Sequence, residues 1–300
     1  MEILRTPDDR FAALPGYAFE PRYAEVDGLR MHYVDEGPPD APPVLLLHGE
    51  PTWSYLYRRM VPVIAGAGYR AIAPDLVGFG RSDKPAAIED YSFARHVGWT
   101  WSLCEAIGLD GMTLVGQDWG SLVGLRLVAE HPERFARVVM ANGFLPTGDV
   151  PPNESWFRFR DATQKAEVFD VQRFVQAGCV RTLEPDVRAA YDAPFPEERF
   201  KAAARAFPLL VPVSPDDPAA PANRAAWEVL SRWRKPFLTA FGDSDKIFKG
   251  LDRFLQGAIR GASGQPHTVI EAAGHFIQED KGEELAGVIV DWLREAKDAG

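Results

Sequence analysis

The sequence of 300 residues predicts a doubly wound α/β fold with a mostly parallel sheet and an inserted helical cap domain. Short apolar runs bounded by Gly, Pro and Asp alternate with stretches of helical periodicity, which is typical of a parallel sheet covered by helices. This alternation stops between about residues 145 and 225 and then resumes. At roughly 150 residues per domain, the length fits two units or one large α/β domain carrying an insertion.

Continuous apolar runs predict the buried strands, because a strand covered on both faces needs no polar side. These runs are Val44–Leu47, Tyr69–Ala73, Met112–Val115, Val138–Ala141, Phe237–Phe241 and Thr268–Ile270. Stretches with helical periodicity lie between most of them, at Tyr55–Ala65, Phe93–Ile107, Leu122–Ala129, Leu251–Ile259 and Glu284–Ala296. Near the start of the chain, two alternating segments flank Asp27-Gly28, which predicts an antiparallel hairpin at one edge of the sheet.

The interrupting segment is rich in proline and contains helix-like pieces without a convincing strand. We interpret it as a helical cap laid over the end of the sheet. The predicted division is therefore a core domain of residues 1–144 and 226–300 and a cap domain of residues 145–225.

Composition excludes several classes of function. With 33 Lys and Arg against 43 Asp and Glu, the net charge is −10, so the chain lacks the basic surface that nucleic acid binding requires. The only cysteines, Cys104 and Cys179, exclude a disulfide framework and a multi-cysteine metal site. Residues 1–10 do not resemble a signal peptide, and no apolar run reaches transmembrane length. We expect a cytoplasmic monomer that binds neither membrane nor nucleic acid.

The most informative motif is Gly116-Gln117-Asp118-Trp119-Gly120, where a predicted strand runs into a helix. This is the pattern of a nucleophile elbow, with Asp in the place where esterases have Ser. The glycines permit a tight turn that presents the central side chain at the carboxyl end of the sheet. Alternatively, Asp118 only caps the following helix, as Asp often does.

A second motif, His48-Gly49-Glu50, follows the strand at Val44–Leu47. In a fold with such an elbow, this loop supplies one backbone N–H of the oxyanion hole, here from Glu50. The residue after the nucleophile, Trp119, supplies the other. We expect a hydrogen-bonding role for His48.

The late His275, in Ala272-Ala273-Gly274-His275-Phe276, is the predicted general base. The order of Asp118, then an acid, then His275 matches the nucleophile–acid–His order of α/β-hydrolases. The acid that orients the imidazole should follow the strand at Phe237–Phe241. Asp243 and Asp245 both lie there, and we favour Asp245 because Asp243, next to a glycine, is the better turn former.

An aspartate nucleophile selects the substrate class. A carboxylate attacks an sp³ carbon that bears a good leaving group, and the product is an alkyl ester of the enzyme. Water activated by His275 then attacks the ester carbonyl while the oxyanion hole stabilises the developing charge. The substrates indicated are alkyl halides or epoxides rather than carboxylic esters.

Together these residues resemble the haloalkane dehalogenases, in particular the subfamily with an Asp–His–Asp triad. The matching motifs are His48–Tyr57 (HGEPTWSYLY), Asp75–Pro85 (DLVGFGRSDKP), Gln117–Gly120, Tyr191–Pro196, Ala206–Pro208 and Gly274–Glu279. The resemblance implies hydrolysis of small apolar haloalkanes to a primary alcohol, halide and a proton, without a metal or an organic cofactor. It also implies that the indole N–H of Trp119 binds the halide ion, for which a donor without an acceptor is suited.

The sequence departs from that family at the second halide donor. Some members place Asn where this chain has Glu50, and those with Glu use a tryptophan of the cap instead. The matching cap position holds Phe159, which cannot donate, and Trp156 lies three residues earlier on the same helix face if Asn153 caps that helix. Trp156 is either the displaced donor or a packing residue. We expect Phe159 and Phe207 to line the apolar substrate pocket.

Two other functions remain alternatives. An epoxide hydrolase would share the triad but usually needs two acidic cap hydroxyls, and the predicted cap contains only Tyr191. A weakly active or non-catalytic ligand-binding protein would explain the replaced cap donor, although it would have no reason to keep Asp118, Asp245 and His275 together.

Overall fold

The computed structural model describes residues 1–298, with side chains up to residue 295. Its main sheet has eight strands in the order β10-β9-β8-β7-β4-β5-β3-β2. The strands are β2 (Arg22–Val26), β3 (Leu29–Glu36), β4 (Pro43–Leu47), β5 (Arg70–Pro74), β7 (Met112–Gly116), β8 (Phe135–Met140), β9 (Phe237–Gly242) and β10 (Thr268–Ile270). All pairs from β10 to β5 are parallel, and β3 joins β5 and β2 in antiparallel register. The predicted mostly parallel sheet is confirmed.

The predicted edge hairpin is also confirmed. β2 and β3 pair with Val26 opposite Leu29, which leaves a two-residue turn. Both turn residues, Asp27 and Gly28, have positive φ, as a tight turn between twisted strands requires. The pair β1 (Ile3–Leu4) and β6 (Lys84–Pro85) was not predicted, because strands of two residues carry no periodic signal.

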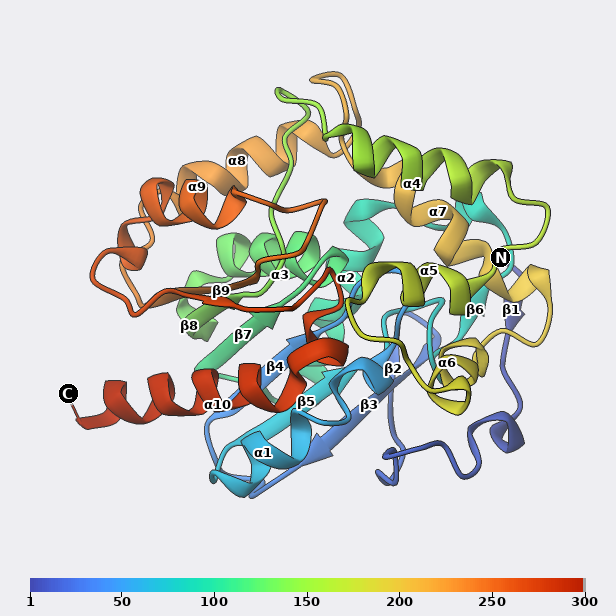
Figure 1. The fold of residues 1–300 in the computed structure, drawn as a ribbon, viewed down its shortest axis with the longest axis horizontal. Coiled ribbons are helices and arrows are strands. Elements are labelled where there is room, and N and C mark those ends of the chain that lie inside the picture. The colour runs from blue at the N-terminus through green and yellow to red at the C-terminus, as the bar shows by residue number, and fades with distance from the viewer. Residues whose placement is uncertain (299–300) are drawn as a thin grey trace.

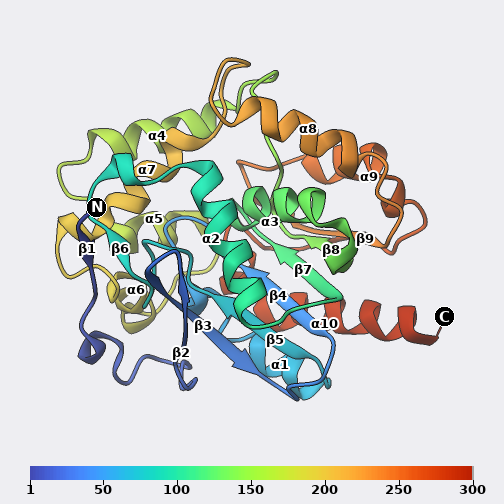
Figure 2. The same ribbon diagram turned by 180° about the vertical axis from the view of Figure 1, so that it is seen from behind.

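Helices cover both faces of the sheet (Figures 1 and 2). The helices α1 (Val61–Gly66) and α10 (Ile277–Asp298, interrupted at Lys281) pack together on the face seen in Figure 1. The helices α2 (Phe93–Ala106) and α3 (Trp119–Glu130) pack together on the face seen in Figure 2. The helix α9 (Leu251–Ala258) packs on β9. This two-sided arrangement is the doubly wound fold that the sequence predicts.

The helix predicted over Tyr55–Ala65 is divided into two pieces. A 3-10 turn covers Ser54–Tyr57, and α1 begins only at Val61. Pro62 explains the break, because its ring would clash with the carbonyl group four residues earlier in a continuous helix. Near the start of a helix the same ring is well tolerated.

Between β8 and β9, where every residue is described, the chain forms only helices and loops. These helices are α4 (Glu154–Lys165), α5 (Val171–Gly178), α6 (Pro185–Asp192), α7 (Ala202–Leu210) and α8 (Ala220–Leu230). Figure 1 shows α4 and α7 lying beyond the carboxyl ends of the central strands. The proposed domain boundary between residues 225 and 226 falls inside α8, which packs on α3 of the core. We therefore propose that the cap ends before α8.

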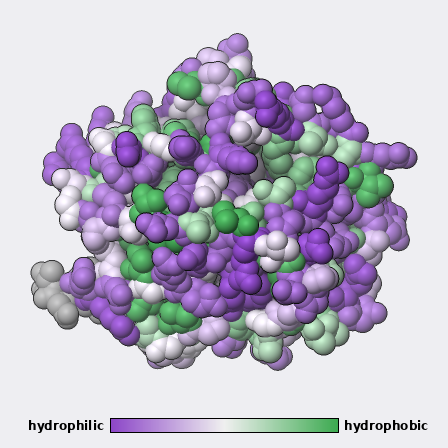
Figure 3. Space-filling model, viewed as in Figure 1, coloured by the Kyte–Doolittle hydropathy of each residue, from purple (hydrophilic) through white to green (hydrophobic). Residues whose placement is uncertain are grey.

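The surface seen in Figure 3 is mainly hydrophilic, with small and separate apolar patches, in keeping with the net charge of −10. Among the described residues, no helix is long and apolar enough to cross a membrane.

Candidate active site

Asp118 stands at the turn between β7 and α3, at the carboxyl end of a central strand. Its φ of 49° and ψ of −127° lie in a region that non-glycine residues seldom adopt. Gly120 allows this turn, because a Cβ at that position would lie 1.9 Å from the carbonyl oxygen of Leu47 on β4. Asp118 occupies the N-cap position of α3, but its side chain makes no capping hydrogen bond. Its carboxylate instead lines a cavity.

A backbone donor holds the Asp118 carboxylate: the N–H of Glu50 donates to Oδ1 at 2.8 Å. The N–H of Trp119, together with that of Glu50, also acts to lower the pKa of this carboxyl group. Gly49 lets the loop approach this closely, since a Cβ there would lie 2.2 Å from Oδ1 of Asp118. The structure thus brings together the two N–H groups predicted to form an oxyanion hole. His48 has the expected hydrogen-bonding role, because its Nε2 accepts from the N–H of Leu76 at 2.9 Å.

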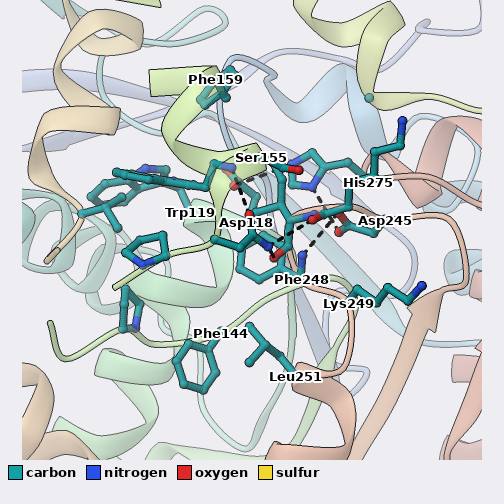
Figure 4. Close-up of a pocket in the computed structure, with 18 of the residues that line it drawn as sticks. Asp118, Trp119, Phe144, Ser155, Phe159, Asp245, Phe248, Lys249, Leu251 and His275 are labelled. Carbon is teal, nitrogen blue, oxygen red and sulfur yellow. Dashed lines mark hydrogen bonds and ion pairs between the residues drawn. The ribbon is translucent and has the colours of Figure 1, made fainter. Parts of the chain in front are cut away.

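His275 lies between two carboxylates (Figure 4). Its Nε2 is 3.6 Å from Oδ2 of Asp118, and its Nδ1 is 3.2 Å from Oδ2 of Asp245. Asp245 is itself held by the N–H of Ile247, which donates to Oδ1 at 2.7 Å. The competing Asp243 is exposed and accepts from the Ser244 hydroxyl, so it stays in its turn and makes no contact with the imidazole.

Two further residues position His275, and the sequence analysis did not assign them. The side-chain amide of Gln117 donates to the carbonyl oxygen of His275 at 3.1 Å and lies 3.2 Å from its Nε2. The side-chain amide of Asn142 donates to the carbonyl oxygens of Gly274 and His275, at 2.7 and 3.1 Å. The adjacency of Gln117 to the predicted nucleophile was a signal that could have identified it.

The three titratable side chains shift one another's pKa. Burial raises the pKa of Asp118 above its usual value, against the opposing charge of His275 and the two backbone donors. Burial also lowers the pKa of His275, but the charge and hydrogen bond of Asp245, together with Asp118, raise it in net. The pKa of Asp245 falls below its usual value, because His275 and backbone donors outweigh burial. Asp245 is therefore ionised at neutral pH and favours the imidazolium form of His275.

These groups open onto a cavity of about 1060 Å³ between the core and the cap. Phe159 lines it, as predicted, and so do Trp119 and Trp156. Figure 4 shows Ser155 and Phe159, one helical turn apart on α4, on the opposite side of the view from Phe144 and Leu251. Other aromatic residues, Phe174, Trp227, Phe248 and Phe254, also contribute to the wall. The hydroxyl of Ser155 is a lining group that the sequence analysis missed.

The prediction that Phe207 lines the cavity is wrong. Phe207 is fully buried and stacks on the Trp119 indole, with ring centroids 4.1 Å apart. Trp119 and the next residue, Pro208, line the cavity, whereas Phe207 does not. Phe207 therefore orients Trp119, whose indole Nε1 has no hydrogen-bond partner among the described residues.

Asn153 caps α4 as predicted, since its side chain accepts from the N–H of Trp156 at 3.0 Å. Its amide also donates to the carbonyl oxygen of Ile247 at 2.8 Å, which ties the start of α4 to the loop that carries Asp245. Trp156 is largely buried, and its indole Nε1 has no hydrogen-bond partner within the described part of the chain. The cap tyrosine, Tyr191, donates its hydroxyl hydrogen bond to Glu279 and does not line the cavity.

Within the described residues, no group of three or more His, Cys, Asp or Glu side chains is placed to hold a metal ion. The arrangement at the cavity is the Asp118 carboxylate, the His275 imidazole with Asp245 at its Nδ1 atom, and the backbone N–H groups of Glu50 and Trp119.

Comparison with known proteins places this geometry in a family. A sequence model described as the alpha/beta hydrolase fold matches residues 42–282. A haloalkane dehalogenase from Psychrobacter cryohalolentis is 54% identical over 300 residues, covering 98% of this chain and 99% of its own length. One from Mycobacterium marinum is 55% identical over 297 residues, covering 97% of this chain and 100% of its own length.

Solved structures agree with the sequence comparison. The tetrameric haloalkane dehalogenase DpaA from Paraglaciecola agarilytica superposes with a TM-score of 0.89 at 36% identity, covering 96% of this chain and 97% of that one. The haloalkane dehalogenase DbeA from Bradyrhizobium elkani gives a TM-score of 0.81 at 26% identity, covering 94% of this chain and 99% of that one.

Proposed function

This chain belongs to the haloalkane dehalogenases of the α/β-hydrolase fold, and we propose that it cleaves the carbon–halogen bond through an alkyl ester formed on Asp118. The observation that carries this mechanism is the Asp118 carboxylate at the elbow, 3.6 Å from the Nε2 atom of His275. An oxygen of Asp118 attacks the carbon that bears the halogen, and the halide leaves with the bonding electron pair. No proton is transferred in this step.

Hydrolysis of the ester needs the base. His275 takes a proton from a water molecule that attacks the ester carbonyl, and the backbone N–H groups of Glu50 and Trp119 stabilise the oxyanion. Esterification removes the negative charge of Asp118, which is one of the groups that raise the pKa of His275. The pKa of His275 therefore falls in the intermediate, so the imidazole is a free base at the stage where a base is needed.

The Trp119 indole is suited to stabilise the leaving halide. Its N–H is unpartnered among the described residues, and stacking on Phe207 fixes its plane. An N–H donor in a cavity with apolar walls interacts more strongly with an anion than it would in water. We propose that this N–H receives the halide as it leaves.

The function is tested by incubating the enzyme with brominated and chlorinated alkanes beside a panel of epoxides and measuring halide and alcohol. We expect halide release from bromoalkanes and chloroalkanes. If no haloalkane yields halide, and wild type and Asp118→Ala behave alike, the proposed mechanism is wrong. If only the epoxides are converted, the enzyme is an epoxide hydrolase, the alternative that an aspartate nucleophile also allows.

Asp245 and Asp243 offer a matched pair of variants. We expect Asp245→Asn to lower kcat on the order of 10³-fold, because the imidazole loses its orientation and the charge that stabilises its protonated form. Since Asp245 raises the pKa of His275, the acid limb of the kcat profile should also move to lower pH. Asp243→Asn should retain the wild-type profile. Equal losses in the two variants would contradict the assignment of Asp245.

The cap donor is tested with Trp156 and Phe159. If the Trp156 indole binds halide, Trp156→Phe weakens bromide binding about tenfold or more, as loss of a hydrogen bond to an anion does. Phe159→Leu keeps an apolar wall and should change substrate preference more than bromide affinity. Unchanged bromide affinity in Trp156→Phe would leave Trp156 with a packing role only. Quenching of tryptophan fluorescence by bromide, corrected for the lost indole, gives both affinities.

We also propose that the enzyme acts as a cytoplasmic monomer, as the sequence predicts. DpaA, whose structure is tetrameric, is a relative that differs in this respect. Light scattering of the purified protein at several concentrations distinguishes the two assembly states.

A further inference from the structure

The base of the proposed mechanism lies in a field of negative charge. Two carboxylates face His275, Asp245 from the loop after β9 and Asp118 from the elbow, and both raise the pKa of its imidazole. The nearby rings of Phe248 and Phe276 carry no charge. A protonated imidazole cannot take a proton from water, so these two carboxylates oppose the step in which the base is needed.

The other titratable groups at the cavity do not offset this field. Among the described residues that line the cavity they are Glu50, Cys179, Lys246 and Lys249. Burial raises the pKa of Glu50 and of Cys179, so both side chains are neutral at neutral pH. The two lysines are exposed, and water screens their charge. The state of the imidazole therefore depends on the two carboxylates and on hydrogen bonds to its ring nitrogens.

A buried amide contacts the proton-accepting atom of the base. The side chain of Gln117 is fully buried, and its Nε2 lies 3.1 Å from the carbonyl oxygen of His275 and 3.2 Å from Nε2 of the imidazole. An amide nitrogen has two hydrogens, one for each of these acceptors. Gln117 directly precedes Asp118, so the turn that presents the nucleophile also presents this donor.

The backbone of His275 fixes the direction of the amide. Exchange of the amide nitrogen and oxygen would bring Oε1 against the carbonyl oxygen of His275, and two acceptors would then face each other. With the nitrogen turned toward both acceptors, Oε1 of Gln117 is buried and has no hydrogen-bond partner among the described residues. Gln117 is therefore a donor to Nε2, and rotation of the amide to make it an acceptor is opposed.

A donor at Nε2 selects one form of the imidazole. A ring nitrogen accepts a hydrogen bond only when it carries no proton, so the ring proton belongs on Nδ1, 3.2 Å from Oδ2 of Asp245. Protonation of Nε2 would bring two N–H groups together at 3.2 Å and would remove a hydrogen bond from a buried amide. Gln117 thus counteracts the two carboxylates that favour the imidazolium.

We propose that Gln117 holds His275 as the free base, because its side-chain N–H donates to Nε2 and keeps the ring proton on Nδ1. The inference rests on the proposed mechanism and adds to it a positioning residue that acts through the base. During alkylation, the contact keeps a proton off the atom that lies 3.6 Å from Oδ2 of Asp118, so no imidazolium N–H weakens the nucleophile. During hydrolysis, the water oxygen bonds to the ester carbonyl carbon, its proton passes to Nε2, and the Gln117 N–H gives up its contact.

Two amides that hold the His275 loop offer a matched pair of variants. Gln117→Met removes the donor to Nε2 but keeps a side chain of similar length. Asn142→Gly removes the amide that donates only to the carbonyl oxygens of Gly274 and His275, and glycine suits the φ of 54° at that position. The measurement is the pH dependence of the decay of the alkyl ester in single turnovers, followed by mass spectrometry.

We expect the two variants to differ in their acid limbs. Without the donor, protonation of Nε2 is less opposed, so the pKa of His275 rises. The acid limb of Gln117→Met should move about half a unit to one unit toward higher pH, the scale of one lost hydrogen bond. The acid limb of Asn142→Gly should stay in place, whatever that variant loses in stability.

Nitrogen NMR of the wild type tests the inference without depending on the folding of a variant. The neutral imidazole of His275, whose signals are absent from His275→Phe, should carry its proton on Nδ1. A neutral ring protonated on Nε2, or a limb in Gln117→Met that stays or moves to lower pH, would overturn the role of Gln117. Equal shifts in Gln117→Met and Asn142→Gly would overturn it as well, since both amides would then act only by holding the loop.

The failure of this inference is distinguishable from failure of the mechanism. A wild-type enzyme that releases halide, but whose neutral His275 carries its proton on Nε2, overturns the role of Gln117 alone. A wild-type enzyme that releases no halide from any haloalkane overturns the mechanism and, with it, this role.

Discussion

His275→Phe should release one halide per active site and then stop. Alkylation of Asp118 needs no base, so the carbon–halogen bond still breaks and the ester accumulates. Hydrolysis of that ester requires a group that takes a proton from water, and phenylalanine cannot do so. Intact-protein mass spectrometry after mixing with a bromoalkane should show a mass increase equal to the alkyl group less one hydrogen, located on the peptide that contains Asp118.

A variant of another histidine is the control. His131 lies at the end of α3, stacks on Trp101 and does not line the cavity. His131→Gln should therefore turn over without a stable adduct. Steady-state turnover by His275→Phe, or loss of even the first halide with the protein folded, would contradict the role of His275 as the base for ester hydrolysis.

Asp118→Asn should abolish halide release while keeping, and strengthening, halide binding. The amide is a poor nucleophile, so we expect kcat to fall by at least about 10⁴-fold, the scale on which loss of a nucleophile acts in other hydrolases. Bromide affinity should rise, because the variant removes a negative charge near the proposed halide donor, the indole N–H of Trp119. The two measurements are initial rates of halide release and fluorescence quenching by bromide.

The role of Asp118 as the nucleophile is tested by halide release and bromide binding measured together. A general decline, with halide release and bromide binding lost together, would point to a damaged site instead of a missing nucleophile. Full activity in Asp118→Asn, without deamidation of the introduced Asn by mass spectrometry, would contradict nucleophilic catalysis by this residue.

Much of the fold could be predicted because parallel strands that are buried on both faces consist of continuous runs of apolar residues. The strand from Phe237 and the strand from Thr268 begin where those runs begin. The differences arise where a local signal competes with helical periodicity. Pro62 interrupts a periodic stretch and divides the predicted helix. The proposed cap boundary falls inside α8, because the packing of α8 on α3 is a contact between distant segments that no local pattern reveals.

At the site, the order of the motifs along the chain and their turn residues were enough to predict the groups that the structure brings together. Asp118, Asp245 and His275 each follow a strand of the sheet, so their side chains meet at one edge. Gln117 and Asn142 were missed because their contacts to the His275 loop join segments more than 100 residues apart.

The directions of cavity side chains depend on packing between the cap and the core, which no local pattern encodes. Phe207 was predicted to line the cavity, but it stacks on the Trp119 indole instead.

The most direct test of the account is a single turnover in ¹⁸O-labelled water, with enzyme in excess over a bromoalkane. Attack of Asp118 on carbon, followed by attack of water on the ester carbonyl, predicts an alcohol whose oxygen is unlabelled. The label should appear in the peptide that contains Asp118. A labelled alcohol together with an unlabelled Asp118 would show that water attacks the carbon directly, which would contradict the covalent mechanism.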